Sequence, residues 1–512
     1  MENRGSPEKI KAGFLEPWRV NNLPEPPKPT LVNVLKTIGP GVIVLMLSIG
    51  SGEWLIGPKS AVEWGTTVLW ICTVSSIFQI MLNFSFARYA LYCGEGVCVG
   101  FSRIWPGPKL WALIWSALLV LSVSPGWAAA SATALAAIIL GRIPEAGDLN
   151  LVNTAGIILT LLVLFLCSFG RSIERNLEKV GWIIVSFIVG SLIVLNVVLV
   201  APRYWIQTLE GFFSFGSIPE GMDPVLLGSF AGYAGAGGFL NTVVSNWMKD
   251  KGFGMGSKVG HVSGLIGGEK VSISSTGWVF RPTEGNLRRW RAWWRFVLID
   301  QWLITWLGWM IGMYLCVLLA VGLIPPGTII EPWACAAYQG QAVSRFLGYA
   351  GWIWVMAIGT WTLFSTQLGA TESFVRQITD ILWNCSKWMR EKICRGDIRR
   401  IYYLIFVGIV FYFIVSILVV RLPLWLIYIV ANMANVVFVV SAIQILVLTY
   451  KYIPREIKPP LYETILVFAS IPFYWYFSAS AFRRTFGQIG FYGLNLFYIT
   501  IIILNLIALK KK

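Results

Sequence analysis

Hydrophobic and polar positions in this sequence alternate on a scale of about 20 residues, the length that a helix needs to cross a bilayer. Long apolar runs are separated by short polar segments. Because a helix satisfies its own backbone hydrogen bonds in lipid, we interpret the runs as membrane-spanning helices. The pattern predicts twelve spans in an all-α polytopic membrane protein: Ile38–Gly57, Thr66–Tyr92, Leu110–Leu140, Leu151–Phe169, Val180–Val200, Pro224–Trp247, Phe296–Leu323, Phe346–Gln367, Ile401–Val420, Leu422–Thr449, Leu461–Phe477 and Phe491–Leu509.

Two of these runs carry poor helix formers near mid-membrane depth. The first contains Gly50, Ser51, Gly52 and Glu53 in succession. Each glycine costs about 1 kcal/mol relative to alanine in a helix, and a carboxylate in the bilayer costs several more. Unwound backbone at this depth is tolerated where it is packed in protein or lines a cavity. The pattern therefore favours a broken helix with a binding site, and Glu53 is a candidate side chain of that site.

The sixth run repeats this feature five spans later. It contains Gly235, Ala236 and Gly238, followed by Asn241. If the first five spans and the next five are inverted repeats, the two breaks occupy corresponding positions. The alternative is close helix packing through small residues. In the eighth run Thr362 is a further candidate, although a hydroxyl there also serves to hold helices together.

The third run contains Ser124-Pro125-Gly126. We expect one kinked helix there, because splitting it would invert every later loop. Of the 41 Lys and Arg residues, 34 then fall on one side of the membrane. By the positive-inside rule this side is the cytosol and holds the amino terminus. Arg288–Arg295, where arginines and tryptophans alternate, reads as an interfacial anchor, so the net charge of +16 implies no nucleic-acid partner.

The predicted organisation has three parts: a mobile cytosolic tail over residues 1–37, a transporter core over 38–449, and two further helices over 450–512. The core comprises repeats at about 38–202 and 224–449 and a cytosolic loop at 249–295, with a small hairpin at Lys270–Phe280. Two glycine-rich stretches in this loop, 252–258 and 264–270, lack phosphate-loop spacing, so no cofactor is expected. No nucleophile, base and orienting group assemble either, so we do not expect an enzyme.

Several stretches resemble the Nramp family of divalent metal transporters, which shares the leucine-transporter fold. They are IGPGVIV before the first break, WGTTVLW after it, RSIERNLEKVGW at the fifth span, GAGGFLN in the sixth and GTWTLFSTQLGATESFVRQITDIL in the eighth. The resemblance covers most of the first ten spans. It implies a secondary transporter with two inverted five-helix repeats that works by alternating access.

The departures from the family pattern bear on the substrate. The family has Asp-Pro-Gly-Asn in its first helix, where this sequence has Gly50-Ser51-Gly52-Glu53, and its sixth-helix methionine is missing here. Without the thioether, the remaining carboxylate and carbonyl ligands suit Mg or Mn better than Fe or Zn. The resemblance also implies an acidic proton route in the third helix, yet Leu110–Leu140 has no Asp, Glu or His. Ordinary proton coupling is therefore not expected.

Three functions remain open from the sequence. The first is a carrier or facilitator of a divalent cation at Glu53 in the cell (inner) membrane. The second is a carrier of bicarbonate or another small anion, because broken helices present amide groups to anions; it requires Glu53 to be protonated or paired, for instance with Lys59. The third is a receptor or scaffold that kept the fold. Asp300 and Glu372 are expected near the cytosolic ends, in reach of water.

Overall fold

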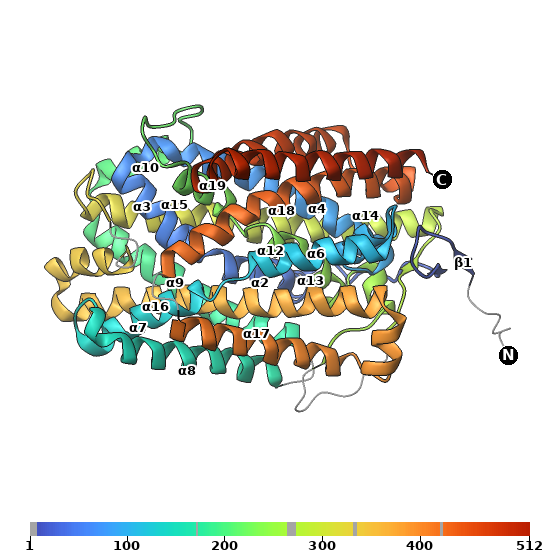
Figure 1. The fold of residues 1–512 in the computed structure, drawn as a ribbon, viewed down its shortest axis with the longest axis horizontal. Coiled ribbons are helices and arrows are strands. Elements are labelled where there is room, and N and C mark those ends of the chain that lie inside the picture. Colours follow the sequence, from blue (N-terminus) through green and yellow to red (C-terminus); the bar gives the residue numbers. More distant parts are fainter. Residues whose placement is uncertain (1–7, 170–172, 264–272, 331–334, 420–422, 512) are drawn as a thin grey trace.

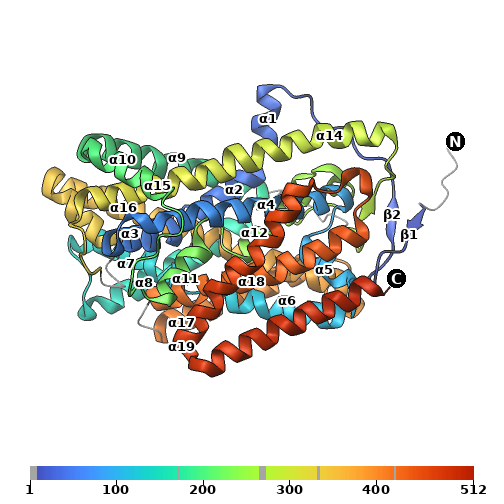
Figure 2. The ribbon, with the colours of Figure 1, turned by 90° about the horizontal axis from the view of Figure 1, so that it is seen from above.

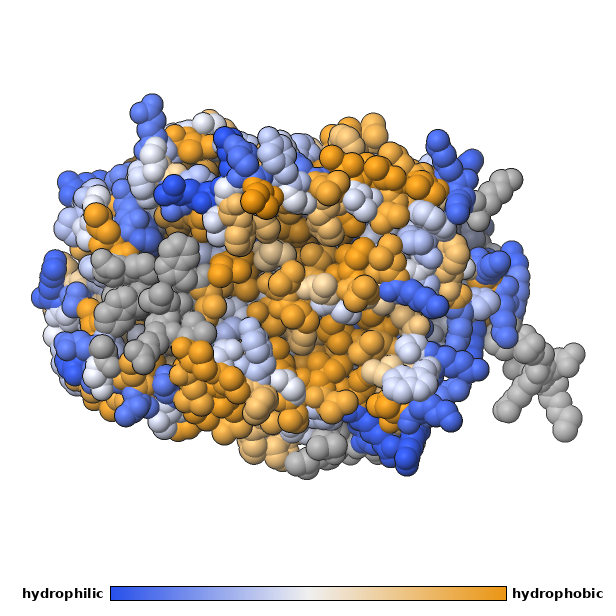
Figure 3. All heavy atoms as spheres, in the orientation of Figure 1, coloured by the Kyte–Doolittle hydropathy of each residue, from blue (hydrophilic) through white to orange (hydrophobic). Residues whose placement is uncertain are grey.

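The computed structural model describes residues 8–169, 173–263, 273–330, 335–419 and 423–511. Ten helices in this part of the chain are long and apolar enough to cross a membrane. Most run along the long axis of the molecule (Figure 1). An apolar band crosses the middle of the face in Figure 3, and hydrophilic residues gather at both ends of that axis. The chain is an all-α polytopic membrane protein, as the hydrophobic pattern predicts.

Two features account for the difference between these ten helices and the twelve predicted spans. The sixth span is broken into α11 (Pro224–Tyr233), α12 (Phe239–Thr242) and α13 (Val244–Lys251). The last helix, α19 (Leu461–Lys510), has non-helical backbone at Gly487. Trp475 Nε1 donates to Asn495 Oδ1 at 2.8 Å across this point, although residues 20 positions apart lie about 30 Å apart on a straight helix. α19 is thus a pair of antiparallel spans.

The first span consists of α2 (Gly39–Ser48), the π-helical turn η1 (Gly52–Ile56) and α3 (Gly57–Trp64). The other spans are α4 (Trp70–Cys93), α6 (Pro108–Ser122) with α7 (Gly126–Leu140), α8 (Leu149–Ser168), α9 (Ile173–Leu199), α14 (Glu284–Leu298) continued by η5 (Ile299–Trp306) and α15 (Leu307–Leu323), α16 (Cys335–Cys385), α17 (Arg399–Val419) and α18 (Pro423–Tyr452). Shorter connecting helices are α1 (Leu31–Thr37), α5 (Val97–Arg103), α10 (Pro202–Gly211) and the turns Thr66–Leu69, Ala146–Asp148, Gly254–Lys258, Met389–Ile393 and Arg455–Ile457.

The third span keeps its direction despite an interruption. α6 ends at Ser122 and α7 begins at Gly126. Pro125, which lacks a backbone N–H, lies between them, and the Ser124 hydroxyl accepts a hydrogen bond from the Gly126 amide at 3.0 Å. The two helices form one apolar span of 33 residues. The predicted kink is therefore present, as a short break in the helix.

Helices at the periphery expose large apolar side chains, as lipid contact requires. Ile183 on α9 is 71% exposed, Phe411 on α17 is 67% exposed, and Ile489 on α19 is 86% exposed. Tryptophans such as Trp54 and Trp127 are fully buried instead. The aromatic residues therefore serve internal packing as well as the bilayer interface.

Residues 9–20, part of the segment predicted to be a mobile tail, are packed against the helix ends. β1 (Lys9–Ile10) pairs antiparallel with β2 (Trp18–Val20), and β2 pairs parallel with β3 (Trp278–Val279). Arg103 donates hydrogen bonds to the carbonyl oxygens of Ala12 and Glu16 and lies 4.8 Å from the Trp18 ring centroid. Burial of Trp18 and this arginine clamp hold the segment against the helix ends. The strands and the carboxyl end of α19 share one end of the bundle (Figure 2).

The segment predicted as a loop over residues 249–295 is helical at both ends. α13 extends to Lys251, and α14 begins at Glu284. Thr283 caps α14 by accepting a hydrogen bond from the Asn286 amide, which explains where the helix starts. The predicted hairpin is replaced by the pairing of β3 with β2 over the part that the structure describes. The glycine-rich stretch 264–270 lies outside the described residues.

Candidate substrate site

The first predicted break is present and is short. α2 ends at Ser48, and after Ile49 and Gly50 the chain resumes as the π-helical turn η1. A side chain at Gly50 would collide with the Thr366 hydroxyl of α16. The glycine therefore allows α16 to lie directly against the break. Thr366 Oγ1 donates at 3.0 Å to the Leu47 carbonyl oxygen, one of those left free at the end of α2.

The second break, between α11 and α12, requires its glycines. Gly235, Gly237 and Gly238 have φ of 134°, 93° and 65°, in the region that side chains disfavour. Gln79 of α4 binds the unwound backbone: its Oε1 accepts from the Ala236 amide at 3.0 Å, and its Nε2 donates to the Ala234 carbonyl at 3.0 Å. The open backbone is thus satisfied by a side chain from a neighbouring span.

The two breaks meet. A side chain at Gly52 would collide with the Tyr233 carbonyl oxygen, so η1 and the end of α11 are in backbone contact. A cavity of about 10 Å³ lies between the breaks, enough for a single water-sized particle. Its wall includes Ser51, Gly235 and Ala236, three of the predicted site residues, together with Trp127 of α7 and Thr366 of α16.

Glu53 follows Gly52, a residue of the cavity wall, but is not itself part of the wall; it is 1% exposed. Its Oε2 accepts from the Gly50 amide at 3.2 Å, whereas Oε1 has no hydrogen-bond partner. The backbone amides of Glu53 itself and of Gly235 also face the carboxyl group. Among the described residues no cationic side chain pairs with it. An ionised carboxylate held this way costs several kcal/mol unless a cation or a proton joins it.

The partner suggested for Glu53 was wrong. Lys59 pairs with Glu63, one helical turn further along α3, and donates to the Ile330 carbonyl oxygen at 2.6 Å. Lys59 lies six residues beyond Glu53, whereas Glu63 is its i+4 neighbour on the same helix face.

The other predicted site residues are buried near the breaks but outside the cavity wall. Gly50 and Gly238 shape the breaks, and a side chain at Gly238 would meet the Ala434 Cα at 2.8 Å. Asn241 donates to Asn83 Oδ1 at 3.0 Å, and Thr362 Oγ1 has no hydrogen-bond partner. These residues support the backbone around the cavity, a role that is consistent with the packing alternative.

Sequence reasoning missed the residues that come from other spans. Trp127 donates to Ser51 Oγ at 3.3 Å, and Gln79 holds the second break. The available signal was a polar or amphipathic side chain inside an apolar run, as with Gln79 in α4. Such residues are also common as contacts between helices, so the pattern alone does not single them out.

Asp300 and Glu372 are fully buried, which contradicts their expected access to water. Asp300 Oδ1 accepts from the Gly41 amide at 2.9 Å and so caps the start of α2 from η5. Its Oδ2 accepts from Gln301, which in turn accepts from Asn83. The apolar runs place both residues near helix ends, but neighbouring helices cover those ends.

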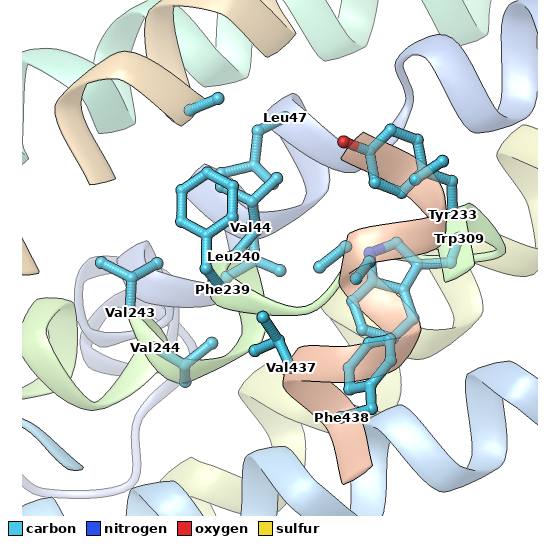
Figure 4. Close-up of a cluster of buried hydrophobic side chains, with 14 of the residues drawn as sticks. Val44, Leu47, Tyr233, Phe239, Leu240, Val243, Val244, Trp309, Val437 and Phe438 are labelled. Carbon is cyan, nitrogen blue, oxygen red and sulfur yellow. The ribbon is translucent and has the colours of Figure 1, made fainter. Parts of the chain in front are cut away.

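An apolar shell encloses the breaks. Figure 4 shows side chains from α2, α11, α12, α15 and α18 converging on this region; those labelled include Val44, Leu47, Tyr233, Phe239, Leu240, Trp309, Val437 and Phe438. Residues of this set such as Val44, Trp309 and Val437 are 1% exposed or less. The shell excludes bulk water and strengthens every electrostatic interaction at the breaks.

Solved structures with the same fold are transporters. A manganese transporter of Eremococcus coleocola, in complex with an aromatic bis-isothiourea substituted compound, matches with a TM-score of 0.65 at 15% identity, over 96% of this chain and 98% of the other. A mutant of that transporter matches over the same shares with a TM-score of 0.63 at 15% identity. A nucleobase-cation-symport-1 family transporter, closed with bromovinylhydantoin bound, matches with a TM-score of 0.51 at 12% identity, over 93% and 92%.

This chain has the fold of these transporters. The expected leucine-transporter-like architecture is thereby confirmed at the level of the fold. No protein-family model and no curated protein matches the sequence. The resemblance to the Nramp family, the inverted repeats and the site residues therefore stay predictions.

Proposed function

We propose that this protein is a secondary transporter of a hard divalent cation such as Mg²⁺ or Mn²⁺, and that Glu53 is its principal side-chain ligand. The observation that carries the proposal is the state of Glu53: it is buried, and one carboxylate oxygen has no hydrogen-bond partner. A cation at Oε1 would supply the missing partner and offset the desolvation of the charge.

The chemistry around the breaks favours a hard ion. The cavity wall offers the Ser51 and Thr366 hydroxyls and backbone groups, without a thioether or imidazole. Oxygen ligands suit Mg²⁺ and Mn²⁺, whereas Fe²⁺ and Zn²⁺ favour sites with sulfur or nitrogen. The described part of the chain has no group of three or more His, Cys, Asp or Glu residues placed to hold a metal ion. The proposed site therefore relies on one carboxylate, hydroxyls, carbonyls and water.

The anion alternative loses one of its two possible supports. It needed Glu53 to be protonated or paired with a cation, and the suggested cation, Lys59, is engaged by Glu63. Moreover, the amides of Gly50 and Gly235, which could attract an anion, face the Glu53 carboxylate instead. The carboxylate thus occupies the place that a small anion would take.

Alternating access would act at the contact between the breaks. η1 touches α11 at Gly52 and Tyr233, and α16 touches the end of α2 at Thr366. Small rotations of these half-helices would open the enclosed cavity to either side without unfolding the surrounding spans.

The test compares the melting temperatures of wild type, Glu53→Gln and Glu63→Gln with and without Mg²⁺ or Mn²⁺. Cation at 100 times the Kd of the Glu53 site should stabilise wild type and Glu63→Gln by about 2.7 kcal/mol more than it stabilises Glu53→Gln. Glu63→Gln is the matched control, because it removes a nearby carboxylate that pairs with Lys59. An equal cation shift in all three proteins would exclude Glu53 from the site. A shift from bicarbonate alone would favour the anion carrier.

A further inference from the structure

A second cavity, of about 470 Å³, opens at the end of the bundle that holds the start of α2 and the end of α13. Its wall includes Thr37, Glu174, Glu178, Asp250, Lys251 and Trp293. These residues come from α1, α9, α13 and α14. By the charge bias of the sequence this is the cytosolic end. The six water molecules around a hydrated divalent cation take roughly 180 Å³, at about 30 Å³ each. The cavity therefore has room for a hydrated ion.

Among the described residues, two carboxylates of this wall each have one oxygen without a hydrogen-bond partner. Glu174 is 2% exposed; its Oε1 is such an oxygen, and it lies 3.6 Å from Lys251 Nζ. Asp250 pairs through Oδ2 with Arg376, but Oδ1 has no hydrogen-bond partner and lies 3.6 Å from Lys249 Nζ. Buried polar atoms normally have at least one hydrogen-bond partner, and each carboxylate oxygen has two lone pairs, so both oxygens can accept a further ligand.

The ammonium group of Lys251 is shared between two glutamates. It donates a hydrogen bond to Glu178 and lies at ion-pair distance from Glu174. A side chain at Gly39 would collide with Lys251 Nζ, so the pair passes directly against the start of α2. Lys251 therefore ties α13 to α9 at the first residue of α2.

Acidic groups outnumber basic ones in the buried cluster around the cavity. The acids are Glu174, Glu178, Asp250, Glu372 and Asp380; the bases are Lys249, Lys251 and Arg376. Lys249 is held by Asp380 at 2.7 Å, and Arg376 also binds Glu372. Arg175 and Lys179, the remaining cations of the wall, are exposed to solvent, where their charges are screened. The cluster thus includes more acids than bases, whereas the wall itself has as many acids as Lys and Arg residues.

We propose that this cavity is a cytosolic vestibule that binds the transported cation in hydrated form at Glu174 and Asp250, in competition with the ammonium group of Lys251. The inference rests on the proposed cation transport. Mg²⁺ keeps several waters and binds through one or two carboxylates, which matches two carboxylates that each have one oxygen without a hydrogen-bond partner. When the cation binds, the Lys251 ammonium group leaves Glu174; when the cation is released, it returns and closes α9 against α13.

The experiment measures Mn²⁺ binding to the purified full-length protein by equilibrium dialysis. In Glu53→Gln, which removes the site between the breaks, one Mn²⁺ should still bind. Adding Glu174→Gln should weaken this remaining binding at least 10-fold, and adding Lys251→Gln instead should tighten it about 3- to 10-fold. Glu284→Gln, which removes an exposed carboxylate from the first turn of α14, should change nothing.

No hydrogen bond joins Glu174 to another described residue, so Glu174→Gln should fold normally, and the melting temperature of each variant checks this. If Mn²⁺ binds wild type but not Glu53→Gln, the vestibule is overturned and the transport site stands. If the remaining Mn²⁺ binds equally to Glu53→Gln with and without Glu174→Gln, Glu174 is not a ligand and the vestibule is overturned as well. If Mn²⁺ binds neither wild type nor any variant, the proposed cation transport itself fails.

Discussion

Two buried glutamates of this protein differ in how their charge is offset. Glu95 accepts hydrogen bonds from Arg103 Nε at 2.8 Å, from the Tyr89 hydroxyl at 2.7 Å and from the Gly277 amide at 2.8 Å. Glu53 has backbone amides and one oxygen without a hydrogen-bond partner. A carboxylate with every partner supplied stabilises the fold, whereas one with a missing partner is free to bind a ligand. This contrast separates the structural residue from the functional one.

The Glu95–Arg103 pair gives a pH-dependent prediction. Burial alone raises the pKa of the Glu95 carboxyl, but the Arg103 guanidinium and the hydrogen bonds from Tyr89 and Gly277 outweigh it and hold the pKa below its usual range. Since the folded pKa is the lower one, the stabilisation is present above the unfolded value of about 4.3 and is lost as pH falls through the folded value. Glu95→Gln should therefore lower the free energy of unfolding by about 3–5 kcal/mol at pH 7 and by less in acid.

Thermal unfolding of both proteins between pH 3.5 and 8 measures this effect. The control is Glu220→Gln, an exposed carboxylate, for which wild-type stability is expected at every pH. A loss of stability in Glu95→Gln that stays constant down to the lowest pH would show that packing, rather than the charge pair, is what the variant loses.

At the scale of elements, the two broken helices were predictable and their supports were not. Gly50 stands out because glycines and the nearby Glu53 conflict with a continuous span, and Gly235 stands out because several glycines surround it. Gln79 and Thr366, which bind the broken backbone, look like ordinary polar contacts in α4 and α16. Which spans face each other depends on long-range packing that no local periodicity encodes. The packing of Trp18 could not be predicted for the same reason, because its partner Arg103 lies far along the chain.

From the contact between η1 and α11 we predict how adding one methyl group, in Gly52→Ala, changes stability and transport. Gly52→Ala would place a Cβ against the Tyr233 carbonyl oxygen, and backbone cannot yield as a side chain does. We expect a loss of about 1–3 kcal/mol of stability and of most transport, because the two breaks would be pushed apart. Gly190→Ala on the exposed face of α9 is the matched control: nothing lies within 4 Å of the added atom, and helix propensity should stabilise it by up to about 1 kcal/mol.

Both proteins can be compared with wild type by melting temperature and by cation flux into proteoliposomes. Full transport by Gly52→Ala at unchanged stability would mean that η1 and α11 can separate at no cost, and that the breaks do not act as one unit.

At the scale of the whole molecule, the hydrophobic pattern predicted the architecture well because the bilayer imposes it. Lipid requires helices with satisfied backbones, so the apolar runs alone located all twelve spans. The strands and the carboxyl end of α19 lie at one end of the bundle (Figure 1), as an even number of spans requires. The face shown in Figure 3 carries its apolar band between two polar ends. Where protein covers protein, as at Asp300, the same reasoning misjudged exposure.

The distribution of acids over the molecule also bears on energy coupling. α6 and α7, which form the third span, contain no Asp, Glu or His, so this span offers no side chain that relays a proton near neutral pH. We therefore expect cation flux without proton flux. Proteoliposomes that contain a pH-sensitive dye, loaded with Mn²⁺ on one side at equal pH, should show Mn²⁺ entry with no acidification of the lumen, and a proton ionophore should leave the rate unchanged. Glu53→Gln serves as the control for carrier-mediated entry. Acidification in fixed proportion to Mn²⁺ entry would refute the expectation, and it would move the proton route to the acids that are fully buried elsewhere, Asp300 on η5 and Glu372 on α16.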